Sequence, residues 1–329
     1  MPLSQQNSTI SIALCICNPR EEFLKKQLES LENQTVLPSE IVVGVESENE
    51  DALALLKEWS DKSEIPCKII QNSKRLGVTQ NFSNVLSKTT GDYVFLCDQD
   101  DVWMPKKIEL SVQQVKKNEG GGTTPVLFHT DLELIDANGA VISRSFMAKQ
   151  RIKGGVQNQL GLLMLNNNVT GCSAAMNRSL LDLALPIPEN AIVHDWWIAQ
   201  VAAITGKTVF VETPLTQYRM HDSNTIGLRS LLSLDTTRRF LEPAHVGREF
   251  ARVVQQNYAL FVHFGDEIPL ETRHFIETLQ TGGFPLLKAA RQAGIKPQTW
   301  SRRIRFNIAA LSKSYKKYLP ALRKMPKTE

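Results

Sequence analysis

Three carboxylates stand close together at Asp98, Asp100 and Asp101, directly after the apolar run at residues 93–97. Carboxylates at the exit of a buried strand repel one another, and a divalent cation shared with phosphate oxygens would relieve that repulsion. Mg²⁺ and Mn²⁺ prefer such oxygen ligands. The pattern therefore predicts a metal and phosphate site. The alternative is a solvated acidic turn in which Asp101 caps the following helix.

A second group with chemical potential is His194-Asp195-Trp196-Trp197, at the start of a helical stretch. An aspartate has an unperturbed pKa of about 3.9, so Asp195 is ionised at neutral pH and can accept a proton from a hydroxyl group. We expect one tryptophan in the core and the other as an apolar wall of the site. Alternatively, Asp195 caps the helix and both tryptophans belong to the core.

The third group is Arg219 and His221, which follow an expected strand at residues 215–218. A neutral imidazole is a suitable ligand for Mn²⁺, and an arginine binds phosphate well. The alternatives are a surface histidine in the turn with Asp222, and an arginine that only pairs with a nearby acid.

These groups need a scaffold that brings them together. Short apolar runs alternate with stretches of helical periodicity, which indicates βαβ units and a mostly parallel sheet. We expect strands at residues 9–16, 41–45, 67–70 and 93–97, with helices near residues 19–31, 51–59 and 78–86. Ligands bind beyond the carboxyl ends of such strands. Asn18, Glu46 and the acidic cluster follow three of these strands, so we expect them at one edge of the sheet.

The middle of the chain is less regular. We expect a hairpin turn at residues 136–139, strands at 170–176 and 208–211, and a helix at 194–204. After about residue 227 the pattern becomes helical and increasingly basic. We therefore expect a domain at residues 1–228 followed by a helical, basic region at residues 229–329.

Six segments, taken in order, resemble the family 2 glycosyltransferases of the GT-A fold. They are SIALCICNPREEFLKKQLESLENQT, NSKRLGVTQNFSNVL, YVFLCDQDDVWMPKKIE, VTGCSAAMNRSLL, HDWWIAQVAAITGK and PLTQYRMHDSN. The resemblance covers about residues 9–228. It implies an α/β fold with a Rossmann-like, mostly parallel central sheet flanked by helices, to which a helical C-terminal extension is added.

The resemblance also implies roles for the clustered residues. Asp98 and Asp100 correspond to the DXD pair of the family, with Asp100 the best ligand of Mg²⁺ or Mn²⁺ and Asp98 near the metal or the donor's ribose. Asp101 is a second candidate, because the run offers a choice. His221 completes the metal shell or meets the diphosphate. Asp195 is the catalytic base, although the family usually has Glu where this chain has His194.

The donor is expected along the loop and helix that contain Arg75, Gly77 and Asn81. One departure concerns the end of the second strand, where the family's base-contacting Asp corresponds to Val45, and Glu46 is expected to replace that contact. The expected donor-binding residues are Asn18, Glu46, Arg75, Gly77, Asn81, Asp98 and Arg219, the acceptor-binding residues are Trp196 and Trp197, and the metal ligands are Asp98, Asp100 and His221. The alternative for Arg75 and Gly77 is a capped turn with a solvated arginine.

The HDWW and YRxH forms are most similar to the bacterial rhamnosyltransferase-like branch. This similarity implies inverting transfer of rhamnose from the nucleotide-sugar donor dTDP-rhamnose to a surface polysaccharide or lipid-linked glycan. A UDP- or GDP-sugar donor is the nearest alternative. A catalytically silent, membrane-associated assembly partner is another, although the presence of Asp100 and Asp195 argues against it.

The net charge of +4 conceals an asymmetry between the two parts of the chain. Residues 286–329 contain 12 Lys plus Arg and one acid, which gives +11 and leaves 4 − 11 = −7 for the rest. Ile304, Ile308, Leu311 and Tyr315 have helical spacing, which predicts a basic amphipathic helix that lies on an anionic membrane. The alternative is a solvated helix packed on the body. Nucleic acid is not expected, because no recognised module accompanies the charge.

Composition excludes several other classes of protein. With 42% hydrophobic and 22% charged residues the chain resembles an ordinary globular protein, and no run approaches the ~20 apolar residues of a membrane span. Five cysteines without a CxxC pair favour a reducing cytoplasm over a disulfide scaffold. Together with the basic C-terminal region, this predicts a place in the cytoplasm or at the inner face of its membrane. No GxGxxG, Walker A or HExxH motif occurs, so dinucleotide enzymes, P-loop kinases and zinc proteases lose support.

Overall fold

The computed structural model describes residues 8–46, 50–150, 152, 160–221 and 242–319 of the chain. The chain divides into two compact units, which we describe separately. Unit 1 comprises Met1–Asn158, Asn168–Glu189 and Val193–Asn224, and unit 2 comprises Gln159–Asn167, Asn190–Ile192 and Thr225–Glu329. The domain boundary expected between residues 228 and 229 lies outside the described residues.

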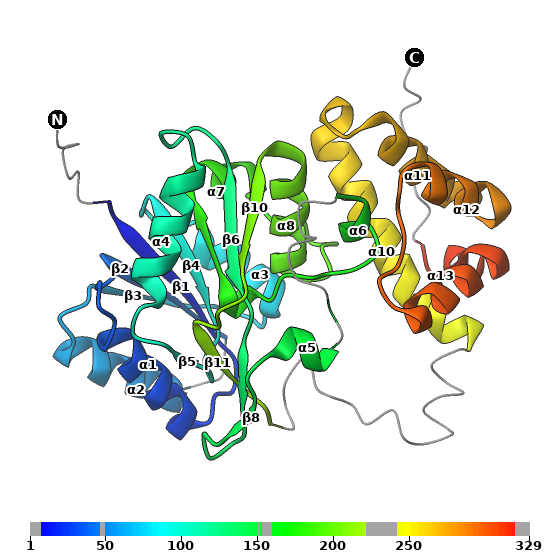
Figure 1. Cartoon of the computed structure of the whole chain (residues 1–329). Helices are drawn as coiled ribbons and strands as arrows, with labels where there is room; N and C mark the ends of the chain where they lie inside the picture. The colour runs from blue at the N-terminus through cyan, green and yellow to red at the C-terminus, as the bar shows by residue number, and fades with distance from the viewer. Residues whose placement is uncertain (1–7, 47–49, 151, 153–159, 222–241, 320–329) are drawn as a thin grey trace. The chain divides into compact units, whose positions relative to one another are not determined.

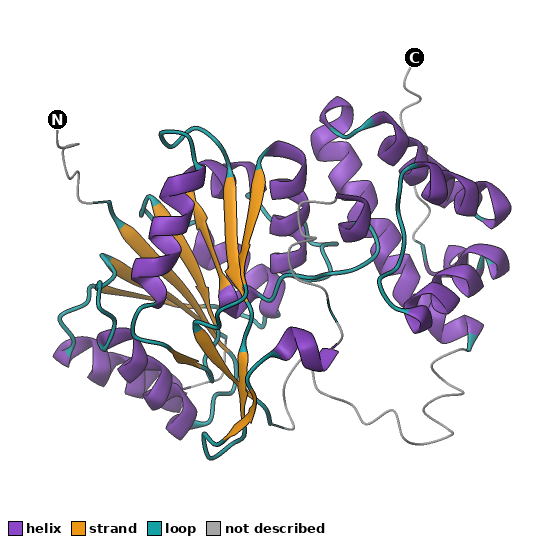
Figure 2. Ribbon diagram, viewed as in Figure 1, coloured by secondary structure: helices purple, strands orange, loops and turns teal. Residues whose placement is uncertain are grey.

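Unit 1 is built on a seven-stranded sheet in the order β10-β6-β9-β4-β1-β2-β3 (Figures 1 and 2). The strands are β1 (Ile10–Ile16), β2 (Glu40–Val45), β3 (Cys67–Gln71), β4 (Tyr93–Cys97), β6 (Val126–Thr130), β9 (Ala174–Asn177) and β10 (Lys207–Val211). Only β9 runs antiparallel to its neighbours in this sheet, which confirms the expected mostly parallel sheet. The register pairs Ile16 with Val45 and Leu14 with Cys97, so β1, β2 and β4 end at one edge.

Helices flank both faces of this sheet, as expected for an α/β fold. The helices α1 (Glu21–Glu32), α2 (Glu50–Lys62) and α4 (Lys107–Asn118) share one apolar core with alternate residues of β1 and β2. The helices α3 (Val78–Leu86), α7 (Arg178–Ala184) and α8 (His194–Thr205) form a second group, in which α8 contacts both of the others. Gly44 allows α3 to lie close to β2, since a Cβ there would lie 2.2 Å from Asn81 Oδ1.

A second, four-stranded sheet has the order β5-β11-β7-β8. Its strands are β5 (Val102–Trp103), β11 (Thr216–Arg219), β7 (Glu133–Ile135) and β8 (Val141–Ser143). The expected hairpin turn joins β7 and β8: Asp136 Oδ1 accepts hydrogen bonds from the backbone N–H groups of Asn138 and Ala140, and Gly139 has a φ of +89°. Because β11 pairs with β5, its end lies beside the acidic loop that follows β4.

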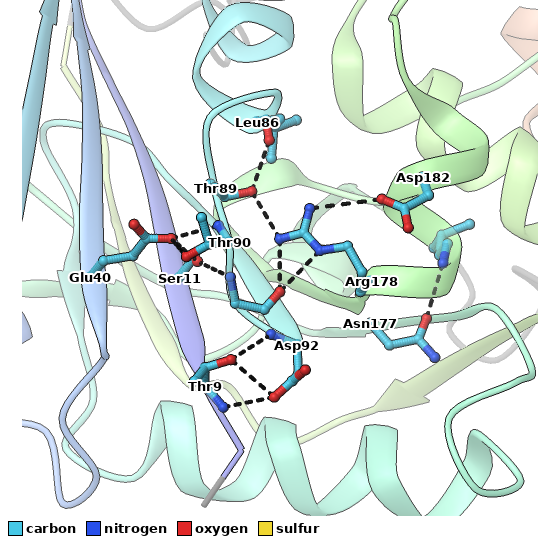
Figure 3. Close-up of polar contacts among 12 residues, drawn as sticks. Thr9, Ser11, Glu40, Leu86, Thr89, Thr90, Asp92, Asn177, Arg178 and Asp182 are labelled. Carbon is cyan, nitrogen blue, oxygen red and sulfur yellow. Dashed lines mark hydrogen bonds and ion pairs between the residues drawn. The ribbon is translucent and has the colours of Figure 1, made fainter.

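The amino ends of the central strands are closed by polar contacts within the protein (Figure 3). The Arg178 guanidinium donates from Nε and Nη2 to the Gly91 carbonyl at 3.1 and 2.7 Å. Asp92 Oδ2 accepts hydrogen bonds from the backbone N–H and the hydroxyl of Thr9 at 2.9 and 3.0 Å. These polar groups have partners within unit 1, so this edge stabilises the fold, in contrast to the carboxyl edge described below.

The described part of unit 2 is helical, which confirms the expected helical C-terminal region. It contains α6 (Leu160–Leu163), α10 (Pro243–Phe264), α11 (Leu270–Thr281), α12 (Gly283–Gln292) and α13 (Trp300–Ser312), with short 3₁₀ turns at Gly265–Glu267 and Ser314–Tyr318. Phe250 of α10 packs against the rings of Phe306 and Tyr315. Among the described residues, no helix combines the length and the hydropathy that a bilayer crossing requires.

The expected apolar stripe along the last helix is wrong. Helix α13 buries Phe306, Ala309 and Ala310, whereas Leu311 is 48% exposed. The helix ends at Lys313, which has a φ of +53° and turns the chain, so Tyr315 lies beyond the helix. The helical spacing therefore does not place Tyr315 on the same face as Ile304 and Ile308. Tyr315 is nevertheless buried, and its hydroxyl donates to the Leu279 carbonyl at 2.6 Å.

Candidate active site

The acidic loop that follows β4 is fixed to the end of β1 by Gln99. Its side chain accepts a hydrogen bond from the Cys17 backbone N–H at 2.7 Å and donates to the Cys17 carbonyl at 3.0 Å. These two hydrogen bonds hold the acidic loop against the end of the neighbouring strand β1. Gln99, which lies between Asp98 and Asp100, therefore has a structural role. The carboxylates on either side, Asp98 and Asp100, remain for other partners.

Asp100 meets His221, although 121 positions separate them in the chain. Asp100 Oδ2 and His221 Nε2 lie 2.7 Å apart, and the His221 ring packs 5.5 Å from the Phe23 ring. β11 brings the histidine to this place, since it ends at Arg219 beside the loop. The structure therefore brings together two of the three residues expected to hold the metal.

Asp101 is fully buried behind the loop. Its Oδ1 accepts a hydrogen bond from the Arg219 backbone N–H at 3.1 Å, whereas Oδ2 has no nitrogen or oxygen donor among the described residues. Burial and, secondly, the charge of Asp100 raise the pKa of Asp101 to about 7. Burial also raises the pKa of Asp98 well above its usual range, with further contributions from Asp101 and Asp100. Both shifts follow from burial and from the neighbouring carboxylates, so several negative charges together are costly here.

The side chains of Asp98, Asp101 and Cys172 each place a possible ligand atom within 4.8 Å of the other two. This group differs from the expected set of Asp98, Asp100 and His221. Burial raises the pKa of the Cys172 thiol well above its usual range, so this sulfur stays protonated and is a poor ligand for a hard cation. The carboxylate oxygens, one of them an unpartnered buried oxygen of Asp101, fit Mg²⁺ or Mn²⁺.

A buried lysine that the sequence analysis missed lies behind these acids. The Lys107 ammonium donates to the Cys172 carbonyl and, at 2.8 Å, to the Thr216 hydroxyl, and it lies 3.7 Å from the centre of the Trp103 ring. Burial lowers the pKa of Lys107 to about 8. Its spacing was a usable signal, since Lys107 lies four and eight residues before Ser111 and Val115 on the buried face of α4.

Asp195 lies in the first turn of α8 and is 7% exposed. Its Oδ2 accepts a hydrogen bond from the Gly171 backbone N–H at 2.8 Å, and its Oδ1 accepts one from the Trp196 backbone N–H at 2.6 Å. The charge of Asp195 is also one of the causes of the raised pKa of Asp98, so the two carboxylates are electrostatic neighbours. The short turn at Gly171–Ser173 therefore contacts the expected base through Gly171 and the acidic cluster through Cys172.

His194 is the buried neighbour of Asp195 at the start of α8. Its ring stacks on Phe82 of α3, with the centroids 3.8 Å apart and the planes at 20°. Burial lowers the pKa of His194 to about 3, so the imidazole is neutral, and neither ring nitrogen has a hydrogen-bond partner among the described residues. A neutral ring at this position adds no charge to a site that already contains several carboxylates.

The two tryptophans have different surroundings. Trp197 has no exposed surface, and its Nε1–H donates to the Ala184 carbonyl at 2.8 Å. It is a core residue, which corrects the expectation that Trp197 contacts the acceptor, because it presents no atom to a ligand. Trp196 is 8% exposed, so the expected acceptor contact rests on this residue alone.

Glu46 faces the loop where the nucleotide is expected. Its Oε2 accepts a hydrogen bond from the Leu76 backbone N–H at 2.8 Å, and its Oε1 is buried without a partner among the described residues. Val45 packs into the core of unit 1, so Glu46 alone of this pair faces the loop. Arg75 is exposed, with a guanidinium nitrogen 3.9 Å from Cys17 Sγ.

The other expected donor residues are divided between surface and interior. Asn18 is exposed with a φ of +47°, and Gly77, which precedes α3, is exposed with a φ of +77° and open space where a side chain would be. Asn81 is buried: its Nδ2 donates to the Gly44 carbonyl and its Oδ1 accepts from Asn72 Nδ2, at 3.0 and 2.9 Å. Asn81 thus joins α3 to β2 through both ends of its amide.

Arg219 is 1% exposed and supports the acidic loop from behind. Its Nε donates to the Asp100 carbonyl at 2.9 Å, and its Nη1 lies 3.2 Å from the carbonyl oxygens of both Asp136 and Ala137. The guanidinium also lies over the Phe23 ring at 4.6 Å. These contacts correct the expectation that Arg219 binds phosphate, since an almost fully buried guanidinium that donates to three backbone carbonyls holds the loop in shape.

Comparisons with known proteins agree on one family. The sequence pattern described as glycosyl transferase family 2 matches residues 11–183, more than half of the 329 residues. An uncharacterized glycosyltransferase of Methanocaldococcus jannaschii is 25% identical over 215 residues, covering 64% of this chain and 70% of that protein. An uncharacterized protein of Mycobacterium bovis is 26% identical over 204 residues, covering 61% of this chain and 56% of that protein. The chain therefore spans little more than half the length of the mycobacterial relative.

Solved structures agree in fold. Residues 1–349 of TarS from S. aureus superpose with a TM-score of 0.53 at 14% identity, covering 94% of this chain and 91% of that chain. The mannosyltransferase PcManGT from Pyrobaculum calidifontis, solved with GDP-Man and Mn²⁺, superposes with a TM-score of 0.53 at 16% identity, covering 93% and 87%. At such identities the likeness concerns the fold alone.

Proposed function

Because the chain belongs to glycosyl transferase family 2 and has the GT-A fold, we propose that it transfers a sugar from a nucleotide-sugar donor to a glycan acceptor with inversion. The observation that carries this proposal is the turn at Gly171–Ser173. Its first N–H binds the Asp195 carboxylate, and its cysteine side chain lies within 4.8 Å of the ligand atoms of Asp98 and Asp101. A base and a diphosphate site that share one short turn suit a reaction between two bound substrates.

In the proposed reaction, Asp195 accepts the proton of the attacking acceptor hydroxyl. The hydroxyl oxygen bonds to the anomeric carbon while the bond from that carbon to the diphosphate breaks on the opposite face, so the anomeric configuration inverts. The Gly171 N–H orients the carboxylate, and neutral His194 limits the negative charge around it. Bound Mg²⁺ or Mn²⁺, held by Asp98, Asp100 and His221, would supply charge neutralisation of the leaving diphosphate.

We assign the donor to the carboxyl ends of β1 and β2 and to the loop before α3. Asn18, Glu46, Arg75 and Gly77 are available there, and the unpartnered Oε1 of Glu46 supports a contact with the nucleotide. Asn81 acts indirectly, by holding α3 in place. The sugar we propose is rhamnose from dTDP-rhamnose, on the HDWW and YRMH sequences. UDP- and GDP-sugars remain the alternatives.

We propose a bacterial surface polysaccharide or lipid-linked glycan as the acceptor, with Trp196 in contact with it, and peripheral association with the inner face of the cytoplasmic membrane. The described residues 286–319 of unit 2 contain nine lysines and arginines and no acid. Phe284 and Trp300 are each 78% exposed in the same unit. Exposed aromatic rings among cations favour an anionic bilayer surface.

Thermal unfolding with dTDP, UDP or GDP, each with and without Mn²⁺, tests the proposal. A ligand at 100 times its Kd stabilises a native site by about 2.7 kcal/mol, which is a measurable shift. We expect one nucleotide to stabilise the protein only with Mn²⁺, and we expect Asp100→Asn to abolish that shift. Asp61→Asn, on the exposed side of α2, is the control. A folded protein that no nucleotide stabilises would support the silent assembly partner instead.

A further inference from the structure

A pocket of about 680 Å³ lies beside α3 within unit 1. This volume is within the usual range of small-molecule sites. The residues that line it are Lys74, Arg75, Leu76, Gln80, Ser83, Asn84, Ser87, Leu185, Pro186 and Glu189. The roles proposed above include only Arg75 of these. We propose that this pocket binds a saccharide unit of the acceptor, an inference that rests on the proposed function.

The far wall of the pocket is fixed to the helix. Gln80 Nε2 lies 3.2 Å from the carbonyl oxygens of both Ile187 and Pro188. The Ile187 backbone N–H donates to the Ser83 hydroxyl at 3.1 Å. Three hydrogen bonds thus hold the segment at residues 185–189 against α3, and the pocket between them is preorganised rather than formed on binding.

A chain of amides sets the polarity of the pocket. It begins at the Gly44 carbonyl, which can only accept, and therefore orients Asn81 Nδ2 toward it at 3.0 Å. Asn72 Nδ2 then donates to Asn81 Oδ1 at 2.9 Å, and Asn84 Nδ2 donates to Asn72 Oδ1 at 3.0 Å. Because every orientation follows from the previous one, Asn84, which lines the pocket, is left with a side-chain oxygen, Oδ1, that receives no hydrogen bond from the described residues.

Charges of both signs line the pocket without pairing. Lys74 and Arg75 stand on the loop before α3 and Glu189 stands at the end of the opposite wall, all three exposed. No ion pair among the described residues joins either cation to Glu189. The pocket therefore offers unused donors on one side and unused acceptors on the other.

A saccharide satisfies this arrangement. Each hydroxyl group both donates and accepts, so one ring can donate to Asn84 Oδ1 and Glu189 while it accepts from Lys74 or Arg75. Leu185 and Pro186 provide an apolar surface for the CH face of a sugar ring. A phosphodiester or fully ionised phosphate group, which only accepts, would meet the Glu189 carboxylate and the Asn84 side-chain carbonyl unfavourably.

The position of the pocket favours the acceptor over the donor. None of the three clustered aspartates lines it. The loop at residues 74–76 is shared, since the Leu76 N–H binds Glu46 where the nucleotide is proposed. Another face of α3 presents Phe82, which stacks on His194 beside the base. The helix α3 and the loop before it therefore connect the pocket both to the expected nucleotide site and to the surroundings of the expected base.

Saturation-transfer NMR with four methyl glycosides tests this inference: those of rhamnose, mannose, galactose and N-acetylglucosamine. We expect at least one to bind the wild-type protein, and Ser87→Trp, which fills the pocket, to weaken that binding at least about tenfold. Glu189→Ala, on an exposed loop, should weaken it several-fold. The matched control is Lys88→Trp, which is equally exposed but lies outside the pocket, and it should leave binding unchanged.

Nucleotide stabilisation is measured on the same samples, so that two failures can be told apart. If the nucleotide binds and no glycoside does, or if Ser87→Trp and Glu189→Ala both bind glycosides like the wild type, the pocket assignment is wrong and the proposed function stands. If no nucleotide binds any folded variant, the proposed function itself fails. Loss of glycoside binding in Ser87→Trp with nucleotide stabilisation intact supports the pocket.

Discussion

Unit 1 contains a cluster of acids and unit 2 contains many cations, and the two groups differ in how deeply they are buried. Asp98, Asp100 and Asp101 are partly or fully buried, and the last two have specific partners in His221 and Arg219. In the described residues 286–319, by contrast, eight of the nine cations are exposed; the half-buried ninth, Arg305, forms an ion pair with Glu249.

This difference predicts how each region responds to change. A buried charge is screened little, so removing it or its partner has a large effect that salt hardly alters. An exposed charge is screened by water and ions, so single substitutions there have small effects that vanish at high salt. The buried region is suited to chemistry on a defined ligand, and the exposed region to contact with an extended charged surface.

The largest effect is expected for Asp195→Asn. The amide can accept only one of the two hydrogen bonds from the Gly171 and Trp196 N–H groups, and it cannot take a proton, so the rate of sugar transfer should fall about 10²–10⁴-fold. Stabilisation by the nucleotide should persist, because the donor site is unchanged. A transfer rate within a factor of two of wild type, measured with saturating donor, would remove Asp195 from the proposed mechanism.

The next effect is expected for Lys107→Met. This substitution removes the two buried hydrogen bonds of the ammonium, to the Cys172 carbonyl and the Thr216 hydroxyl, and should lower the free energy of unfolding by about 2–4 kcal/mol, measured by urea denaturation without metal. Lys106→Met is the matched control, since Lys106 is the exposed neighbour at the start of the same helix. Equal losses in the two variants would contradict a structural role for the buried ammonium.

A pH experiment sharpens the comparison further. The pKa of Asp101 is raised to about 7 by burial and by Asp100, whereas the unfolded chain releases this proton near pH 4. Between these values the folded state binds more protons than the unfolded state, so Asp101 lowers stability progressively as the pH rises.

We therefore expect Asp101→Asn to match the wild type near pH 4 and to exceed it by about 1–3 kcal/mol at pH 7.5 without metal. Denaturation midpoints at several pH values give the difference, and Mn²⁺ should reduce it by stabilising the wild type. A difference that is constant across this pH range would mean that Asp101 is already ionised in the folded protein.

The comparison also explains what the sequence could predict. Alternating apolar runs were sufficient for the central sheet, since β1, β2 and β4 are continuous buried segments, and the hairpin at residues 136–139 has its own turn residues. Clusters contiguous in sequence, such as Asp98 to Asp101, were equally visible. Periodicity was less reliable in unit 2, where the left-handed Lys313 ends α13 and turns Tyr315 away from the expected stripe.

Contacts that depend on distant segments could not be read in the same way. Arginine is a residue type that often binds phosphate. Only the pairing of β11 with β5 and β7 shows that Arg219 is enclosed behind the acidic loop. Lys107 lies beside an equally basic neighbour, and its burial depends on Cys172 and Thr216 from other elements. Burial of a charge is a tertiary property, which composition and local spacing do not contain.

The smallest effect concerns the exposed region, where contact with an anionic membrane is proposed. A Cβ on Gly283 would lie 3.2 Å from Lys313 Cε, so this lysine stands beside the start of α12, next to Phe284. Leu270, in the same unit, is 68% exposed but is adjacent to acids at residues 266, 267 and 271. Phe284 and Leu270 are therefore similarly exposed, but Phe284 lies near cations and Leu270 lies near acids.

We expect Phe284→Ser to weaken co-sedimentation with phosphatidylglycerol vesicles several-fold at low salt, and Leu270→Ser to leave it unchanged. Replacing both Lys316 and Lys317 by Gln should cost about 1 kcal/mol per lysine, an effect that fades as the salt concentration rises. Equal loss in the Phe284 and Leu270 variants would show that hydrophobic exposure alone drives binding. Wild-type protein that does not sediment with these vesicles at low salt would mean that the cations of unit 2 serve another partner, and the contrast with the buried acids would then concern burial only.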